Sequence, residues 1–389
     1  MSTLQVEGIR NAAASSDAIT LATDGTCTAK VTNNLSNRNL IINGAMKVAQ
    51  YGTSDTSNGY FTTVDRWNCT VNGLEENVTR SQESLSTSDT GPYEKGFRNA
   101  WKFVNGNQTG GADAGGYIIP QYAIEAQDLA NSGWNYKSAS SYITLSFWVK
   151  SSVAQTFYGF FRTIAGTDQA YSFSYALSAN TWTKVTKTIP GLANGNIDIN
   201  DDNTNGMSLF LPLFMGTDRT TSSHTLNTWA AYSGSNRTPD QTTTWYTTND
   251  ATWHLTGVQL EVSDHATEFE HRSYGDELSR CERYYQTTYQ GAGDAYPRIG
   301  LGLAASDTQV QFVYHFRTVM RAAATASQSG AFRVDGATTK DVTSITFQNG
   351  SNTAHQGNFF TGAGLGANNP YIIRGHNDAD ARLNFDAEL

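Results

Sequence analysis

The stretch Ile143-Thr144-Leu145-Ser146-Phe147-Trp148-Val149 carries an aliphatic or aromatic core residue at every second position. Successive side chains of a β-strand point to opposite faces, so Ile143, Leu145, Phe147 and Val149 share one face. A strand with one wholly apolar face covers a hydrophobic core. This stretch therefore predicts a half-buried β-strand.

The same pattern recurs further along the chain. The segment Leu255–Val262 alternates in the same way, and we expect Val258, Leu260 and Val262 to face inward. Four other segments also predict strands: Tyr117–Tyr122, Phe157–Arg162, Tyr171–Tyr175 and Trp182–Ile189. Short strands separated by polar turns predict an antiparallel sandwich, of the jelly-roll type.

One strand of this sandwich has a proline within it. The segment Ser208–Met215 is apolar on both faces and predicts a strand covered on both sides. Pro212 cannot donate a hydrogen bond to a strand ladder, so it marks an edge or a bulge.

A helix and a second β unit follow the sandwich. Ser273 and Asp276 have the spacing of a capping box, and Leu278, Cys281 and Tyr285 follow at helical spacing, which predicts a helix over Asp276–Thr287. Beyond it β patterns return, at Val310–Phe316, Val342–Phe347, Tyr371–Ile373 and Arg382–Phe385. We therefore divide the chain into an arm (1–39), a sandwich (40–275), a helix or hinge (276–289) and a smaller β domain (290–389).

The composition agrees with an all-β fold and excludes several classes of protein. The 389 residues include 35 Gly and 7 Pro, with 16% charged and 12% aromatic residues. A disordered chain would be rich in charge and poor in aromatic residues. The net charge of −9, without a cluster of Lys or Arg, disfavours nucleic-acid binding. No apolar run approaches the ~18 residues of a transmembrane helix, so we expect no membrane insertion.

The first 39 residues predict a separate arm. Their apolar side chains are too sparse to bury a core, so the segment is either a flexible tail or an arm that orders against a partner. The N-terminus has neither the basic start nor the apolar core of a secretory signal. Cys27, Cys69 and Cys281 are odd in number and widely spaced, which fits reduced, structural thiols. We expect the chain to be made in a cytoplasm.

Metal and cofactor sites are poorly supported by residue spacing. His265 and His271 are not spaced to share one face of a helix or strand. Asp198, Asn200 and Asp202 alternate like the start of a calcium loop, but the turn glycine and the downstream glutamate are missing. A solvated turn is the alternative. We expect neither a metal nor a cofactor.

No catalytic residue can be nominated from the sequence. The glycine-rich segments Gly300–Gly302 and Gly362–Gly366 lack dinucleotide-binding spacing, and no Gly-x-Ser-x-Gly elbow is present. Glu261 is a candidate carboxylate for glycoside hydrolysis, and its alternative is a solvent-facing strand residue. We expect that the chain is not an enzyme.

Aromatic residues in loop-like segments are the candidates for ligand binding. Aromatic faces with polar tips suit stacking against sugar rings, while neighbouring Asn, Asp and Thr can bond to the hydroxyls. In the alternative, each ring anchors its loop to the sandwich core. The candidate residues are Trp134, Tyr136, Trp229, Tyr232, Trp245 and Tyr246.

Several stretches resemble a family of bacteriophage tail-fibre and minor structural proteins of the marine-phage type. The most specific are LTGVQLEV (255–262), FEHRSYGDEL (269–278) and CERYYQ (281–286). Others are STLQVE (2–7), AITL (18–21), NLIINGAMKVAQYG (39–52), DRW (65–67), LSFWVKS (145–151), NTWTK (180–184), MRAA (320–323) and DAEL (386–389).

This resemblance implies a virion appendage with a sandwich similar to carbohydrate-binding modules. Such proteins are usually homotrimers that contact the host surface, so the implied ligand is a host surface glycan and the implied location is the virion. Residues 1–39 would then bind other virion proteins. Two alternatives stay open: a structural head fibre or capsid decoration protein, and a polysaccharide depolymerase.

Overall fold

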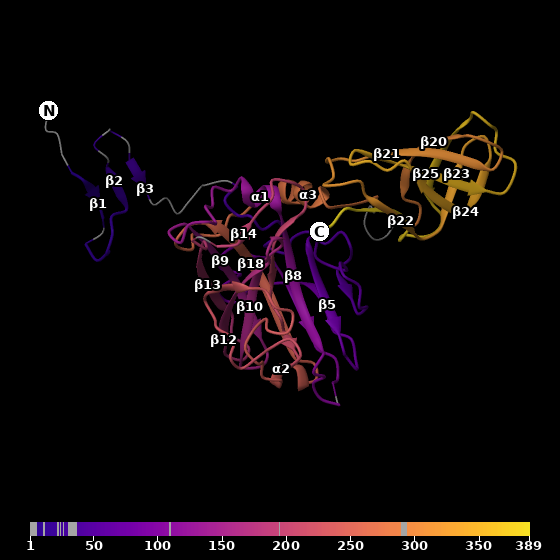
Figure 1. The fold of residues 1–389 in the computed structure, drawn as a ribbon. Helices are drawn as coiled ribbons and strands as arrows, with labels where there is room; N and C mark the ends of the chain where they lie inside the picture. Colours follow the sequence, from indigo (N-terminus) through magenta and orange to yellow (C-terminus); the bar gives the residue numbers. More distant parts are fainter. Residues whose placement is uncertain are drawn as a thin grey trace.

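Two antiparallel sheets that face each other form the central part of the fold (Figure 1). The computed structural model describes residues 6–10, 12–21, 23, 25, 37–108, 110–193, 195–288 and 294–389, and the backbone of residues 27–29. Much of the predicted arm, the side chain of Cys27 and the predicted boundary at residue 290 lie outside the described residues.

The first sheet, called here the β9 sheet, has the strand order β13-β9-β18-β7-β6-β4. Strand β9, which lies between β13 and β18, contains the alternating stretch quoted first, and all four residues of the predicted inner face are fully buried. The strands are β4 (Ser54–Asp55), β6 (Thr79–Ser84), β7 (Asn99–Val104), β9 (Tyr142–Ser151), β13 (Thr183–Pro190) and β18 (Thr252–Val262).

The opposite sheet, called here the β8 sheet, has the order β16-β8-β15-β10-β12-β17, with β5 also paired to β8. Pro212 lies between β15 and β16, which both pair with β8, so the proline interrupts the ladder as predicted. The strands are β5 (Trp67–Asn72), β8 (Tyr117–Glu125), β10 (Gln155–Thr163), β12 (Gln169–Leu177), β15 (Asn205–Phe210), β16 (Phe214–Met215) and β17 (Trp229–Ala231). The pair β11 (Ala165–Gly166) and β14 (Ile197–Asp198) lies outside both sheets.

The inner faces of the two sheets meet in one aromatic core. Trp67, Trp101 and Trp253 are each at most 1% exposed, and their rings pack against those of Tyr122 and Phe103. Complete burial of a large apolar side chain contributes about 1.5–3 kcal/mol. Many of the aromatic residues that the composition shows therefore lie inside the sandwich.

Strand β18 departs from regular alternation at Gly257. Its pairing with β9 shifts register between Thr256 and Gln259, and Gly257 has a φ of +63°. Val258 and Leu260 are buried as predicted. Val262 pairs with Ile143 and so lies on the inner side of the sheet as predicted, but this last residue of the strand is 37% exposed and lines an open surface pocket with Leu40.

The predicted helix is present but shorter than expected. Helix α3 spans Tyr274–Glu282, and the Ser273 side chain accepts a hydrogen bond from the backbone N–H of Asp276, as the capping box predicted. The predicted span Asp276–Thr287 was wrong at both ends, because Tyr285–Thr287 forms strand β19, which pairs with β27. Two further short helices occur, α1 (Ala126–Ala130) and α2 (Thr244–Thr247). No helix in the described part of the chain is long and apolar enough to span a membrane.

The C-terminal unit is a closed six-stranded barrel with a small sheet beside it (Figure 1). The barrel strands, in the order β20-β21-β25-β24-β23-β26, are β20 (Arg298–Ala304), β21 (Gln309–His315), β23 (Phe332–Asp335), β24 (Thr339–Gln348), β25 (Ala354–Thr361) and β26 (Pro370–Gly375). The small sheet, in the order β19-β27-β22, contains β19 (Tyr285–Thr287), β22 (Thr325–Ser329) and β27 (Arg382–Asp386). After β27 the chain returns to the sandwich, where Glu388 forms a buried ion pair with Arg66.

A last sheet lies near the N-terminus and joins β1 (Gly8–Ile9), β2 (Ile19–Leu21) and β3 (Cys27–Ala29). The described chain is thus built of antiparallel β-strands with only short helices. The predicted fold class is confirmed: an all-β antiparallel sandwich, a helix and a smaller C-terminal β unit. The domain boundaries that the sequence suggested stay predictions.

Candidate functional site

Four of the six aromatic residues predicted to bind a ligand are part of the sandwich core. They are at most 8% exposed, and three of them donate their indole N–H to a backbone carbonyl of a neighbouring segment. A ring that is buried on both faces offers no surface for stacking against a ligand. The alternative of core anchoring therefore describes these residues, which are Trp134, Trp229, Trp245 and Tyr246.

The other two, Tyr136 and Tyr232, are half-buried and lie apart. The Tyr136 ring packs beside Trp134, with 6.0 Å between the centroids. The Tyr232 ring is covered by the guanidinium of Arg162, 3.9 Å from its centroid. Helix α1, which precedes Trp134, and helix α2, which contains Trp245, lie at opposite ends of the sandwich (Figure 1). The six aromatic residues therefore do not form one site.

Glu261 is neither solvent-facing nor placed for catalysis. The residue is 2% exposed, and its carboxylate accepts hydrogen bonds from Thr267 N (2.8 Å), Thr267 Oγ1 (2.6 Å) and Gln259 Nε2 (2.9 Å). Arg38 Nε lies 3.7 Å away. This carboxylate is fully used in fixing the loop that follows β18, so both interpretations of it from the sequence were wrong.

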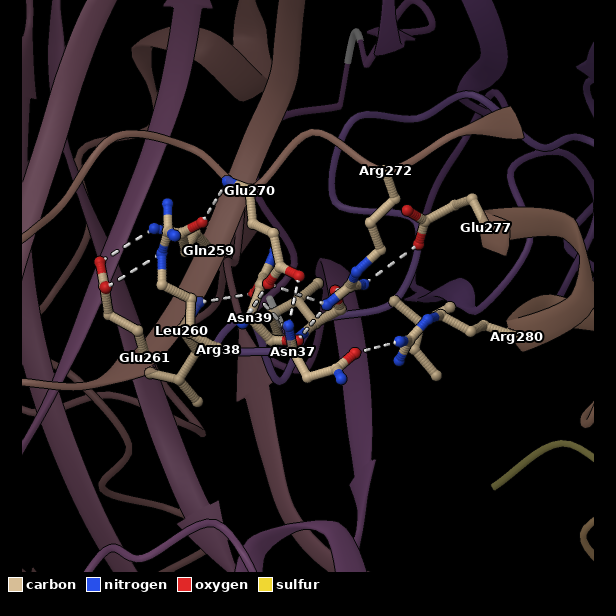
Figure 2. A network of polar contacts seen from close by, with 12 residues as sticks. Asn37, Arg38, Asn39, Gln259, Leu260, Glu261, Glu270, Arg272, Glu277 and Arg280 are labelled. Atoms are coloured by element: carbon tan, nitrogen blue, oxygen red, sulfur yellow. Dashed lines mark hydrogen bonds and ion pairs between the residues drawn. The ribbon is translucent and has the colours of Figure 1, made fainter. Parts of the chain in front are cut away.

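Glu261 belongs to a larger polar network that joins the start of the sandwich to β18 (Figure 2). Asn39 exchanges hydrogen bonds with the backbone of β18, through Leu260 N (3.0 Å) and Val258 O (3.1 Å). Glu270 accepts from the backbone N–H of Asn39 at 2.8 Å, and Arg272 donates to the Asn39 carbonyl at 2.6 Å. These hydrogen bonds hold residues 39 and 270–272 against β18.

The groups considered for metal binding have other partners. Asp198 pairs with Lys137 at 2.7 Å, and Asp202 accepts from Thr204 N at 2.9 Å. No group of three or more His, Cys, Asp or Glu side chains within the described ranges could hold a metal ion. Cys69 and Cys281 are buried free thiols, and burial raises the pKa of Cys69 to about 12.

A different set of side chains meets on the outer face of the β9 sheet. Trp148 lies on the face of β9 opposite the core residues, between Lys184 of β13 and Thr256 of β18 in the strand register. The ring is half-buried, because the segment around Gly91 packs against it. Trp148 also packs against a small apolar cluster, separate from the sandwich core, that includes Phe97 and Phe269.

Beside Trp148 lies a small hollow of about 130 Å³. Phe97, Phe269 and His271 form a ring cluster in its wall, with centroids 4.8 to 5.1 Å apart. Gly257 forms part of the wall, and a Cβ there would come within 2.6 Å of the Phe97 ring. The lack of a side chain at Gly257 therefore lets the Phe97 ring pack directly against β18. The other lining residues are Lys95, Ser146, Trp148, Lys184 and Glu268.

The rim of the hollow offers both donors and acceptors. Lys95 and Glu268 are exposed and lie 3.6 Å apart. The Nε2 atom of His271 lies 2.8 Å from the carbonyl of Lys95, so Nε2 carries the proton and Nδ1 is an acceptor when the ring is neutral. Burial lowers the pKa of His271, which favours that neutral form. Lys184 adds an exposed ammonium group.

A second polar cluster continues along the same face. Trp182 Nε1 and Lys150 Nζ both donate to Asp89, at 3.0 and 2.9 Å. Burial of Asp89 favours its protonated form, but these bonds and one from a backbone N–H outweigh burial and lower its pKa. His254 bonds to Glu83 at 2.9 Å and, together with Lys102, lowers the pKa of Glu83 to about 2. The side chains in this part of the face are therefore held in place by hydrogen bonds and ion pairs, and several of them are charged.

The chemistry of this face suits a sugar. Apolar ring surfaces can pack against the C–H face of a pyranose, and a few donors and acceptors at the rim can bond to its hydroxyls. These residues are not among those predicted from the sequence, although one signal was available. In the alternating stretch of β9, Trp148 stands among Thr144, Ser146 and Lys150 on the otherwise polar face.

Comparison with known proteins does not assign this chain to a family. No protein-family model matches the chain, and no curated protein does. Solved structures with a partial likeness include a carbohydrate-binding module in complex with β-1,4-galactotriose (8% identity, 58% of this chain and all of that one, TM-score 0.26). A second is a family 16 carbohydrate-binding module (9% identity, 46% of this chain and 84% of that one, TM-score 0.23). A third is the N-terminal cellulose-binding domain of Cellulomonas fimi β-1,4-glucanase C (15% identity, 56% of this chain and all of that one, TM-score 0.26). At these TM-scores the likenesses carry no conclusion about this chain.

Proposed function

We propose that the chain is a non-catalytic sugar-binding protein, and that the hollow beside Trp148 takes one sugar ring of a surface glycan. The observation that carries this proposal is the placement of the half-buried rings of Trp148 and Phe269 at an open hollow on the outer face of a rigid sheet, with the buried ring of Phe97 in its wall. At about 130 Å³ the hollow is smaller than the roughly 300–1,000 Å³ of typical ligand pockets, so it can take no more than a single sugar ring.

The finer part of the proposal concerns the setting in which the protein works. The resemblance of residues 255–286 to phage tail-fibre proteins supports a virion appendage that binds host surface glycans during attachment. A hollow for one ring gives weak binding per site. Several copies held together, as in a homotrimer docked to the virion through residues 1–39, would convert weak binding into strong avidity.

Binding to host cells tests the proposal. The purified full chain carrying a fluorescent label should stain host bacteria, and periodate oxidation of the cell-surface glycans should remove the staining. Replacement of Trp148 by alanine should weaken binding at least about tenfold, because the ring supplies most of the stacking surface. Trp148→Leu keeps apolar bulk but removes the flat ring, so it should show the same loss with less effect on folding.

Tyr274→Ala is the matched control. Tyr274 is 58% exposed on α3 and does not line the hollow, so its removal should leave staining unchanged. Staining by a folded Trp148→Leu protein at the wild-type level would overturn the proposed site. Release of reducing ends from the host polysaccharide would show that the protein is a depolymerase instead.

A further inference from the structure

The lysines of this chain are concentrated on one face. The sequence contains nine lysines in a chain of net charge −9. Four of them belong to the outer face of the β9 sheet or to the rim of its hollow: Lys95, Lys102, Lys150 and Lys184. Whether this face attracts anions depends on which of these lysines have a carboxylate partner.

Three of these four lysines are already neutralised. Lys95 lies 3.6 Å from Glu268, Lys102 lies 3.2 Å from Glu83, and Lys150 lies 2.9 Å from Asp89. Their carboxylate partners cancel their charge toward a ligand.

Lys184 differs from the other three. It has no ion pair and no hydrogen bond with any residue that the structure describes, and its side chain is exposed. In the strand register it is the direct neighbour of Trp148. The hollow therefore has, among its described residues, one ammonium group without a partner, next to its principal aromatic ring.

The charge inside the hollow follows from these contacts. Lys95 and Glu268 cancel, and His271 is neutral at ordinary pH because burial lowers its pKa. Lys184 leaves the hollow with a formal charge of about +1. A neutral sugar could not form an ion pair with Lys184. A sugar with a carboxylate or sulfate group would pair with it while its ring packs against Trp148.

We infer that the preferred ligand of the hollow is an anionic sugar, one that carries a carboxylate or a sulfate group. This inference rests on the proposed function, since it names the class of sugar for the same site. Lys184 selects the charge of the ligand, whereas Trp148 binds the ring of any sugar that fits.

Matched polysaccharides test the inference. Affinity electrophoresis of the full chain would compare pectate with carboxyl-reduced pectate, and dextran sulfate with dextran. We expect retardation by at least one anionic polymer to exceed that by its neutral counterpart about tenfold. The pectate pair reports a carboxylate and the dextran pair reports a sulfate. Added salt should weaken binding to the anionic polymer, because exposed charges are screened.

Lys184→Gln should remove both the preference and its salt dependence, while binding to the neutral polymer persists. Lys137→Gln is the matched control, since Lys137 is an exposed lysine whose partner Asp198 lies outside the hollow. An equal loss with both variants would overturn the inference by showing nonspecific charge attraction. Failure to bind either anionic polymer would also overturn it.

The test separates the inference from the proposed function. Trp148-dependent binding that is equal for charged and neutral polymers would overturn the anionic preference and leave the sugar site in place. Anionic binding that Trp148→Leu does not weaken would count against both.

Discussion

The carboxyl group of Asp65 is fully buried near the junction between the sandwich and β19. It accepts hydrogen bonds from the backbone and the side chain of Gln50, at 2.6 and 2.5 Å, and the same Gln50 amide donates to the carbonyl of Tyr285. Burial raises the pKa of Asp65 to about 7, although the hydrogen bonds from Gln50 oppose the rise. The negative charge of nearby Glu388 adds to it.

This raised pKa predicts a specific pH dependence of stability. An unfolded Asp has a pKa of about 3.9, so between about pH 4 and pH 7 the folded chain keeps a proton that the unfolded chain has released. The contribution of Asp65 to stability is therefore complete below about pH 4 and is lost as the pH rises through 7. Asp65→Asn stays neutral and should gain stability relative to the wild type across this window, by roughly 1.4 kcal/mol per pH unit at most.

Urea unfolding at several pH values between 4 and 8 measures the effect. The comparison between variant and wild type is needed because Asp386 and Glu388 also have raised pKa values. Asp250→Asn replaces an exposed carboxylate and is the control, which should follow the wild-type curve. Parallel curves for Asp65→Asn and the wild type would show that Asp65 is already ionised throughout.

At the scale of single elements, the bulge in β18 connects the fold to the site. Gly257 takes a φ of +63°, a conformation that costs a residue with a Cβ about 1–2 kcal/mol. A Cβ there would also lie 2.6 Å from the rigid ring of Phe97. Gly257→Ala should therefore lower the free energy of unfolding by roughly 2–5 kcal/mol, the sum of backbone strain and overpacking. It should weaken sugar binding as well.

Substitutions at two other glycines allow the backbone strain and the overpacking to be measured separately. Gly133 has a φ of +85°, but a methyl group at this position would have no atom within 4 Å, so Gly133→Ala should show only the backbone strain. Gly234 has open space and no positive φ, so Gly234→Ala should be close to neutral. If Gly257→Ala costs no more in urea unfolding than Gly133→Ala, the close approach to Phe97 has no energetic effect.

At this scale, the features that could be predicted from the sequence are those specified by residues close together in the chain. The inner face of β9 follows from alternation alone, and the start of α3 follows from Ser273 and Asp276, because both patterns involve only near neighbours. The end of α3 could not be predicted. Residues Tyr285–Thr287 leave the helix to pair with β27, which lies about a hundred positions further along the chain.

In the same way, only the part of the candidate site that depends on a local sequence pattern could be predicted. Trp148 on the polar face of an alternating strand is visible in the sequence. Its companions Phe97 and Phe269 belong to separate loops, and only the folded chain brings them to the outer face of the β9 sheet. Composition could not distinguish these rings from Trp245 and Tyr246, which occur in hydroxyl-rich sequence but pack into the core.

At the scale of the whole molecule, the sandwich and the barrel have separate hydrophobic cores. The described residues of the two core clusters do not overlap. What joins the two units is largely polar and aromatic: the ion pair of Arg66 with Glu388, the pair of Arg283 with Glu125, and the stacking of Tyr51 on Tyr285 at 3.7 Å. A junction of this kind couples two cores less tightly than a shared apolar interior would.

We therefore predict that the protein unfolds in two thermal transitions instead of one. Leu145 is fully buried in the sandwich core and Phe359 in the barrel core. Leu145→Ala should cost about 2–5 kcal/mol and Phe359→Ala about 3–5 kcal/mol, each within its own unit. In differential scanning calorimetry, each variant should lower the midpoint of one transition and leave the other near its wild-type temperature. A single transition that both variants lower alike would show that the junction makes the two cores one cooperative unit.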